Sequence, residues 1–307
     1  MLDPDGLYEL VDPGELPELD RPVLIQALSG FVDAGNGTRL AREHLLAELD
    51  ARQVAEFDID QLLDYRSRRP MMTFVEDRFT RYDAPHLALH LVRDAGGTGF
   101  LLLSGPEPDL QWERFIAAVS RLIGRFNVRL TVGLNSIPMA VPHTRPAGVT
   151  SHATRPELLA AHDPWLQRVQ VPGSAGNLLE YRLGEGGRDA IGFAVHVPHY
   201  LAQAEYPDAA ELLLGSVSRA SGLLLPTEKL RTAGELTRAA VDRQVEADAE
   251  ASALVKALEE QYDAFLRGRG SANLLAPQAG LPTAEELGAE LERFLAEQPR
   301  NDPPAGS

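Results

Sequence analysis

The segment PVLIQALSGFVDAGN, residues 22–36, contains a strand, a loop and the beginning of a helix. Pro22 to Leu28 is an almost continuous apolar run, and it ends at Ser29-Gly30, a pair that favours a turn. From Ala34 to Leu49 the apolar residues recur at helical spacing, which indicates a helix. This segment therefore predicts a strand, a loop and a helix in that order.

The same unit recurs further along the chain. Phe100 to Leu103 predicts a second strand, Ser104 to Pro108 a loop, and Asp109 to Phe126 a helix with Asp109 as its N-cap. Two more strands are predicted over residues 128–134 and 190–197, and a helix over residues 208–220. Strands that alternate with helices predict an α/β fold with a mostly parallel sheet flanked by helices.

Two regions depart from this alternation of strands and helices. Before residue 100, polar and apolar residues alternate, most clearly from Arg78 to Val92, and with a turn near Asp83 to Pro85 they predict an inserted β-hairpin. After Pro226, residues 227–266 carry apolar side chains at helical spacing and predict a long helical hairpin or a bent helix.

These patterns divide the chain into four parts. They are an N-terminal segment (residues 1–20), an α/β domain (21–225), a C-terminal helical extension (226–298) and a disordered tail (299–307). Within the extension, residues 268–282 predict a linker, and residues 283–297 predict a short helix with a capping box from Thr283 to Glu286.

Composition excludes several classes of protein. The chain has 307 residues, with 29 Lys or Arg against 45 Asp or Glu, a formal charge of −16 and no cysteine. The absence of cysteine excludes a disulfide framework, a zinc ribbon, an iron–sulfur site and a thiol nucleophile. An acidic chain lacks the basic surface to which nucleic acids and anionic membranes bind, so we expect neither as a partner.

Localisation is predicted from the N-terminal segment and from the length of the apolar runs. The start from Met1 to Asp20 is acidic and rich in proline rather than basic and apolar, so it does not resemble a secretory signal. The longest apolar runs, such as Leu212 to Leu214, are far shorter than the ~20 residues that span a bilayer. We therefore expect a cytoplasmic protein.

Four loops leave the carboxyl ends of the predicted strands, where open α/β sheets form their sites. Two carboxylates, two imidazoles and a guanidinium among them could perform acid/base chemistry or hold an anion. Alternatively, these side chains are turn and capping residues that fix the loops. The candidate crevice residues are Gly30, Asp33, Asn36, Gly105, Glu107, His143, Thr144, Arg145 and His199.

The common cofactor motifs are missing. Lys229 follows Glu228 and Lys256 follows Val255, so there is no Gly-Lys pair for a phosphate-binding loop. Gly96 to Gly99 precedes a predicted strand, whereas a dinucleotide-binding loop links a strand to a helix. We therefore expect no cofactor and no bound metal, although the helix after Asn36 could bind a phosphate through its backbone amides.

Four motifs occur in an order that resembles a known family. They are Leu28 to Asn36, Gly105 to Pro108 followed by Trp112, Val141-Pro-His-Thr-Arg-Pro146 and Val197-Pro-His-Tyr200. Together they resemble the bacterial branch of the proteasome assembly chaperone type-two family over about residues 20 to 225. The resemblance implies a purine-nucleoside-phosphorylase-like fold, a bacterial homotrimer and no established enzymatic activity.

Two hypotheses for the function follow. The first is a homo-oligomeric binding or chaperone-like protein, with a trimer favoured and a further protein partner in complex assembly. The second is a small-anion or nucleoside-directed hydrolase or transferase, with Asp33 or Glu107 as the base and His143 and Arg145 as the anion clamp. Members that dock on proteasome rings in several cases end in a hydrophobic-Tyr-any tail, whereas this sequence ends in Pro304-Ala-Gly-Ser307.

Overall fold

The structure is a computed structural model that describes residues 2–11, 19–30, 32–159 and 168–268. The short helix predicted over residues 283–297 and the tail predicted over residues 299–307 lie outside this part of the chain. Among the described helices, none is both long and apolar enough to cross a membrane.

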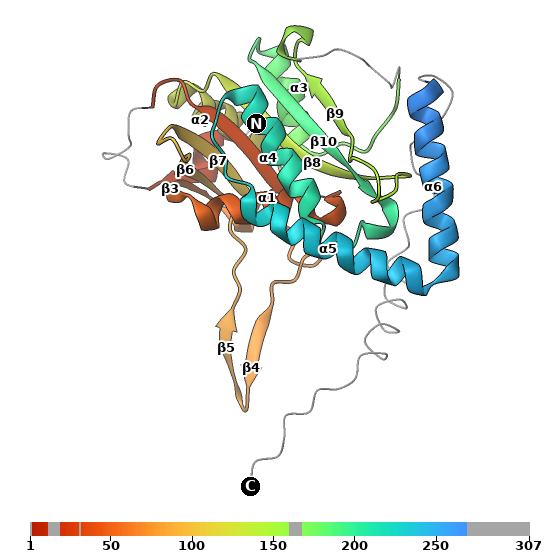
Figure 1. The fold of residues 1–307 in the computed structure, drawn as a ribbon. Coiled ribbons are helices and arrows are strands. Elements are labelled where there is room, and N and C mark those ends of the chain that lie inside the picture. Colours follow the sequence, from red (N-terminus) through yellow and green to blue (C-terminus); the bar gives the residue numbers. More distant parts are fainter. Residues whose placement is uncertain (1, 12–18, 31, 160–167, 269–307) are drawn as a thin grey trace.

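The centre of the molecule is a mixed sheet of eight strands (Figure 1). The strands are β1 Tyr8–Leu10, β2 Val23–Ser29, β3 Asp50–Phe57, β6 Ala88–Arg93, β7 Gly99–Pro106, β8 Leu130–Met139, β9 Val149–Ala153 and β10 Ala190–Pro198, in the spatial order β1-β3-β6-β7-β2-β8-β10-β9. Neighbours within β7-β2-β8-β10 are parallel, and the outer strands on both sides pair antiparallel. The predicted α/β class is confirmed, with the parallel part confined to the four central strands.

Helices cover both faces of this sheet. One face packs against α1 Gly37–Glu48, α4 Pro207–Ser221 and α5 Glu228–Ala247, and the other against α2 Trp112–Arg125 and α3 Ala175–Glu185. Successive residues of β2 point to opposite faces, so that Ile25 enters the α1/α4 core and Leu24 enters the α2/α3 core. A strand buried on both faces is apolar at every position, which explains the apolar run that begins after Pro22.

Short 3-10 helices occupy several connections. They are η1 Pro4–Leu7, η2 Ala34–Asn36, η3 Ile59–Gln61, η4 Pro156–Leu158 and η5 His199–Leu201. Two of them, η2 and η5, follow β2 and β10 at the carboxyl end of the parallel strands. They therefore position the loops that the sequence motifs occupy.

The inserted hairpin consists of β4 Met72–Val75 and β5 Arg78–Tyr82, which form a separate two-stranded sheet. It projects away from the rest of the molecule (Figure 1). Its position differs from the sequence prediction, because residues 78–92 belong to two sheets and the turn lies at Glu76-Asp77. The alternating pattern continues through β5 and β6 alike, and alternation alone does not specify which strands pair.

The C-terminal extension contains α5 and α6 Ala249–Gly268. The two helices meet at Asp248, where the backbone is extended and the carboxylate accepts hydrogen bonds from the amides of Glu250 and Ala251. This cap starts a new helix in a new direction. As a result α6 lies beside the loop that follows β8 (Figure 1).

Candidate functional site

The first loop of the candidate crevice is fixed by Asp33. One carboxylate oxygen accepts hydrogen bonds from the Thr38 amide and the Ser136 hydroxyl, both at 2.7 Å, and the other accepts from the Arg39 amide at 3.0 Å. Asp33 thus joins the start of α1 to β8 and places a negative charge at the helix N-terminus. The two amides that a phosphate would need at this helix are bound to Asp33.

Asn36 completes the turn into α1 in the left-handed conformation, with φ of 53°. Its side-chain amide donates to the Ala204 carbonyl at 3.4 Å, and its oxygen accepts from Arg39 Nε at 3.3 Å. Asparagine adopts this conformation more readily than most residues. Asn36 therefore connects the loop after β2 to the loop after β10.

Glu107 occupies the second loop and is 4% exposed. Its backbone amide donates to the Ser29 carbonyl at 2.8 Å, and its carboxylate accepts a hydrogen bond from the amide of Ala175, the first residue of α3. A Cβ at Gly30 would overlap this carboxylate, and a Cβ at Gly105, which has φ of +143°, would overlap the backbone of Leu87. Gly30 therefore leaves room for the carboxylate with which Glu107 caps α3, and Gly105 lets the preceding backbone pass close to Leu87.

His143 lies in the third loop and its side chain is 2% exposed. Its Nδ1 is 2.7 Å from the Tyr200 hydroxyl, which also accepts a hydrogen bond from the His143 amide at 2.8 Å. Its Nε2 is 3.0 Å from a carboxylate oxygen of Asp242 in α5. His143 therefore links the loop after β10 to the C-terminal extension.

Thr144 and Arg145 continue this link to α6. Arg145 Nε and Nη2 each donate to one oxygen of Asp263 at 3.0 Å, and Nη1 lies 3.2 Å from Glu259. Thr144 donates to the same Glu259 oxygen at 2.5 Å. The hydrogen bond from Arg145 lowers the pKa of the Asp263 carboxyl, as expected for a bidentate arginine–carboxylate pair.

Apolar contacts accompany these polar ones. Met139 and Val141 are buried, and Tyr262 and Phe265 of α6 pack against them. The Tyr262 hydroxyl also donates to the Pro146 carbonyl at 2.9 Å. The loop from residue 139 to 146 is therefore the docking surface of the C-terminal helices, and we call it the docking loop.

His199 lies next to this network. Its ring meets the Tyr200 ring edge-on, with centroids 5.5 Å apart. Its Nδ1 is buried and has no hydrogen-bond partner within the described ranges. Tyr200 is thus in ring contact with both candidate histidines.

The candidate residues therefore lie in three places along one edge of the sheet. Asp33 and Asn36 are at the start of α1; Gly30, Gly105 and Glu107 are at the start of α3; and His143, Thr144, Arg145 and His199 surround the docking loop. Across the described residues, no group of three or more acidic or histidine side chains has the arrangement of a metal site. The polar contacts named above fix helices and loops, which is the capping alternative inferred from the sequence.

Comparison with known proteins identifies a family over most of the fold. The model of the PAC2 family matches residues 27–245, from within β2 to near the end of α5. The chain belongs to the PAC2 family. The match therefore includes all the loops described above and stops before α6.

Solved structures of similar proteins support this assignment. A protein of unknown function from Mycobacterium tuberculosis is 52% identical, with a TM-score of 0.83 over 86% of this chain and 91% of that one. A protein of unknown function from Corynebacterium glutamicum is 41% identical, with a TM-score of 0.81 over 85% and 98%. A proteasome-assembly chaperone homologue from M. tuberculosis is 25% identical, with a TM-score of 0.70 over 76% and 99%. A search of curated proteins gives no match.

Several residues of this PAC2 protein acquire a role only in the structure. Tyr200, Asp242, Glu259 and Asp263 hold the docking loop, and three of them lie in the extension, which the predicted crevice did not include. The signal for Glu259 and Asp263 is their spacing of four residues, which places two carboxylates on one face of a helix. Nothing in the sequence indicates which loop that face meets.

Proposed function

We propose that this PAC2 protein is a cytoplasmic, homo-oligomeric, chaperone-like protein that binds partner proteins during the assembly of a complex. A trimer is the favoured oligomer, and the proposed activity requires no cofactor. The β4–β5 hairpin carries this proposal, because its apolar surface is exposed in the single chain.

Every residue in the two hairpin strands is exposed. Phe74 and Phe79 meet edge-on with centroids 5.1 Å apart, yet they remain 57% and 64% exposed, and Met72 and Tyr82 are about half exposed. An isolated two-stranded hairpin is only marginally stable in water. A contiguous apolar surface of this kind is typical of an interaction site.

The charge of the hairpin favours a second copy of this chain as its binding partner. Residues 66–82 contain five arginines and two carboxylates, a net charge of +3, in a chain whose total is −16. A basic arm is attracted to an acidic surface, and each copy of the chain offers one. We therefore assign the hairpin to contacts between copies.

The similarity to a proteasome-assembly chaperone homologue supports an assembly role for the resulting oligomer. The polar contacts of the crevice carboxylates also favour this role over a hydrolase or transferase. Asp33 and Glu107 accept hydrogen bonds from the backbone amides of helix N-termini. To act as a general base, either carboxylate would have to give up hydrogen bonds that stabilise a helix.

Light scattering after size-exclusion chromatography tests the oligomer. Wild type should elute at a multiple of 33.4 kDa, with about 100 kDa for the trimer. Replacing both Phe74 and Phe79 by serine should shift the mass towards one chain, because apolar contacts drive such association. The control is Leu236→Ser on α5, which is 70% exposed and outside the hairpin. A monomeric wild type would refute the oligomer.

The assembly role needs a separate measurement. Wild type should accelerate the formation of rings from purified proteasome α-type subunits, and the Phe74→Ser, Phe79→Ser variant should not. Equal rates with and without the wild-type protein would contradict a role in proteasome assembly, whatever the oligomeric state.

A further inference from the structure

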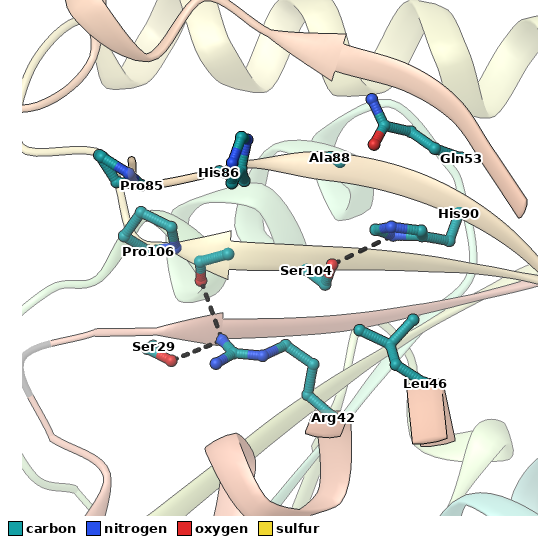
Figure 2. A pocket seen from close by; sticks show the side chains of 11 residues that line it. Ser29, Arg42, Leu46, Gln53, Pro85, His86, Ala88, His90, Ser104 and Pro106 are labelled. Carbon is teal, nitrogen blue, oxygen red and sulfur yellow. Dashed lines mark hydrogen bonds between the residues drawn. The ribbon is translucent and has the colours of Figure 1, made fainter. Parts of the chain in front are cut away.

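A hollow of about 600 Å³ opens beside α1 (Figure 2), and none of its lining residues belongs to the docking loop. Arg42 and Leu46 of α1 form one wall, the β3, β6 and β7 strands form the floor, and His86 lies at the edge. This volume is within the range of about 300 to 1,000 Å³ that is typical of small-molecule sites. Two of the four sequence motifs reach its lining through Ser29, Gly105 and Pro106, but Arg42 and the two histidines lie outside all four motifs.

The floor of the hollow contains polar side chains, although it continues the face of the sheet that forms the α1/α4 core. Along β7, Phe100 and Leu102 on this face are fully buried in that core. The next position on the same face is Ser104, which is 6% exposed and lies 3.2 Å from Nδ1 of His90. Burial lowers the pKa of His90, which favours the neutral imidazole. The hollow therefore has an imidazole and a hydroxyl on the face of the sheet that is apolar in the adjoining core.

Arg42 provides the only arginine or lysine side chain in the described lining of the hollow. Its side chain is 15% exposed, and Nη1 donates to the Ser29 hydroxyl at 2.7 Å and to the Gly105 carbonyl at 3.3 Å (Figure 2). Its ion-pair partner, Glu43, is 3.6 Å from Nη2 and half exposed. Burial lowers the pKa of Arg42, which shows that the protein only partly compensates the cost of desolvating this cation.

The guanidinium group also keeps unused donors. Of its five N–H groups, those on Nη1 bind Ser29 and Gly105 and one side of Nη2 faces Glu43, whereas Nε makes no hydrogen bond to any described residue. The Nε–H and the second Nη2–H form a planar pair of donors that fits a carboxylate or a phosphate. The apolar side chains of Leu46 and Ala88 line the same hollow and suit the organic part of such a ligand.

We propose that this hollow binds a small organic anion whose carboxylate or phosphate group pairs with Arg42. The organic part of the ligand lies against Leu46 and Ala88, and His86 and His90 supply further hydrogen bonds. The proposal does not depend on the oligomer or on the assembly role. It assigns a ligand site to the α1 side of the sheet, separate from the candidate crevice residues around the docking loop.

Isothermal titration calorimetry of the full chain tests the proposal with four probes, which are benzoate, phenyl phosphate, inorganic phosphate and the neutral benzamide. Benzoate or phenyl phosphate should bind saturably at millimolar concentration, and benzamide should bind at least about tenfold more weakly, because it lacks the charge that pairs with Arg42. A response to benzoate alone would identify a carboxylate ligand, and a response to phenyl phosphate alone a phosphate ester. Tighter binding of inorganic phosphate than of both aromatic anions would overturn the assignment of an organic ligand.

Variants test whether the anion binds in the hollow or elsewhere on the surface. Arg42→Gln should weaken anion binding about 10- to 100-fold, which is the range for loss of a charge-assisted pair. His86→Glu should also weaken it, and because the His86 side chain is 70% exposed, this change leaves the core intact even if Arg42→Gln affects folding. The control is Arg39→Gln, one turn earlier on α1, where the arginine shares Glu43 with Arg42, pairs also with Glu205 and does not line the hollow. Equal affinities in wild type, Arg42→Gln and His86→Glu would overturn the proposal, as would equal binding of benzamide.

Discussion

Replacing His143 by alanine tests whether the docking loop holds the C-terminal helices in place. Burial raises the pKa of Tyr200 to about 12, so its hydroxyl keeps its proton at neutral pH and donates it to Nδ1 of His143. With Nδ1 as the acceptor, the ring proton lies on Nε2 and is donated to Asp242. One ring thereby joins β10, the docking loop and α5, and alanine removes both bonds.

The cost follows from the burial of each partner. The hydrogen bond between Tyr200 and His143 joins uncharged groups and is shielded from solvent, and its loss costs about 1 to 1.5 kcal/mol. The Tyr200 hydroxyl is then left without its acceptor, which costs about 1 kcal/mol more. The Asp242 bond has a charged acceptor, but the Asp242 side chain is 54% exposed, so solvent limits its value to below about 1 kcal/mol. We therefore expect His143→Ala to lower the free energy of unfolding by about 3 kcal/mol.

A double-mutant cycle separates the two bonds. Urea denaturation followed by circular dichroism gives the free energy of unfolding for His143→Ala, Tyr200→Phe, Asp242→Asn and the two double variants. The coupling energy should be about 1 kcal/mol for the Tyr200 pair and smaller for the Asp242 pair. A loss below about 0.5 kcal/mol for His143→Ala, or a larger coupling to Asp242 than to Tyr200, would refute the reasoning.

Two further predictions concern α6 and acid stability. Arg145→Ala should speed hydrogen exchange in α6 roughly two- to fivefold by mass spectrometry, while the sheet exchanges as in wild type. The effect is limited because the partners of Arg145, Glu259 and Asp263, are 27% and 38% exposed. Unchanged α6 exchange would contradict the docking contact. Burial lowers the pKa of His196 in β10 to about 4, so between pH 6.5 and 4 the unfolded chain binds a proton that the folded chain does not. As the pH falls through that window, the free energy of unfolding should decrease by up to about 1.4 kcal/mol per pH unit. Urea denaturation at each pH measures this dependence, and His196→Gln should weaken it.

The four parallel strands could be predicted from the sequence because burial on both faces leaves a simple signal. Residues 22–28, 100–103 and 190–197 are largely apolar runs followed by loops, residues 128–134 carry apolar side chains at every second position, and each stretch overlaps a parallel strand of the structure. A parallel connection also requires a crossover, so the helices between the runs support the same interpretation. Local pattern and topology agree in this part of the chain.

The elements that the sequence did not reveal have weaker local signals for identifiable reasons. Strand β9, at the edge of the sheet, is half exposed throughout and contains Thr, Ser and His, and β3 is interrupted by a register shift between Gln53 and Ala55. Helix α3 contains Gly176 and Gly184, which lower helix propensity. Tertiary packing favours glycine at both positions, because a Cβ would crowd the Gln26 side chain at the first and press on Thr154 at the second.

The crevice illustrates a different limit of sequence reasoning. Parallel topology correctly placed the four loops at one edge, but the side chains that suit an anion, such as Arg145 and Thr144, suit the carboxylates of a helix equally well. In the structure Glu259 and Asp263 already occupy these donors. An anionic ligand at Arg145 would therefore have to displace α6, so any function of the docking loop in binding is coupled to the position of the C-terminal helix. Arg42, by contrast, makes no described hydrogen bond through Nε and lies beside an open hollow, so an anion can reach it without moving a helix.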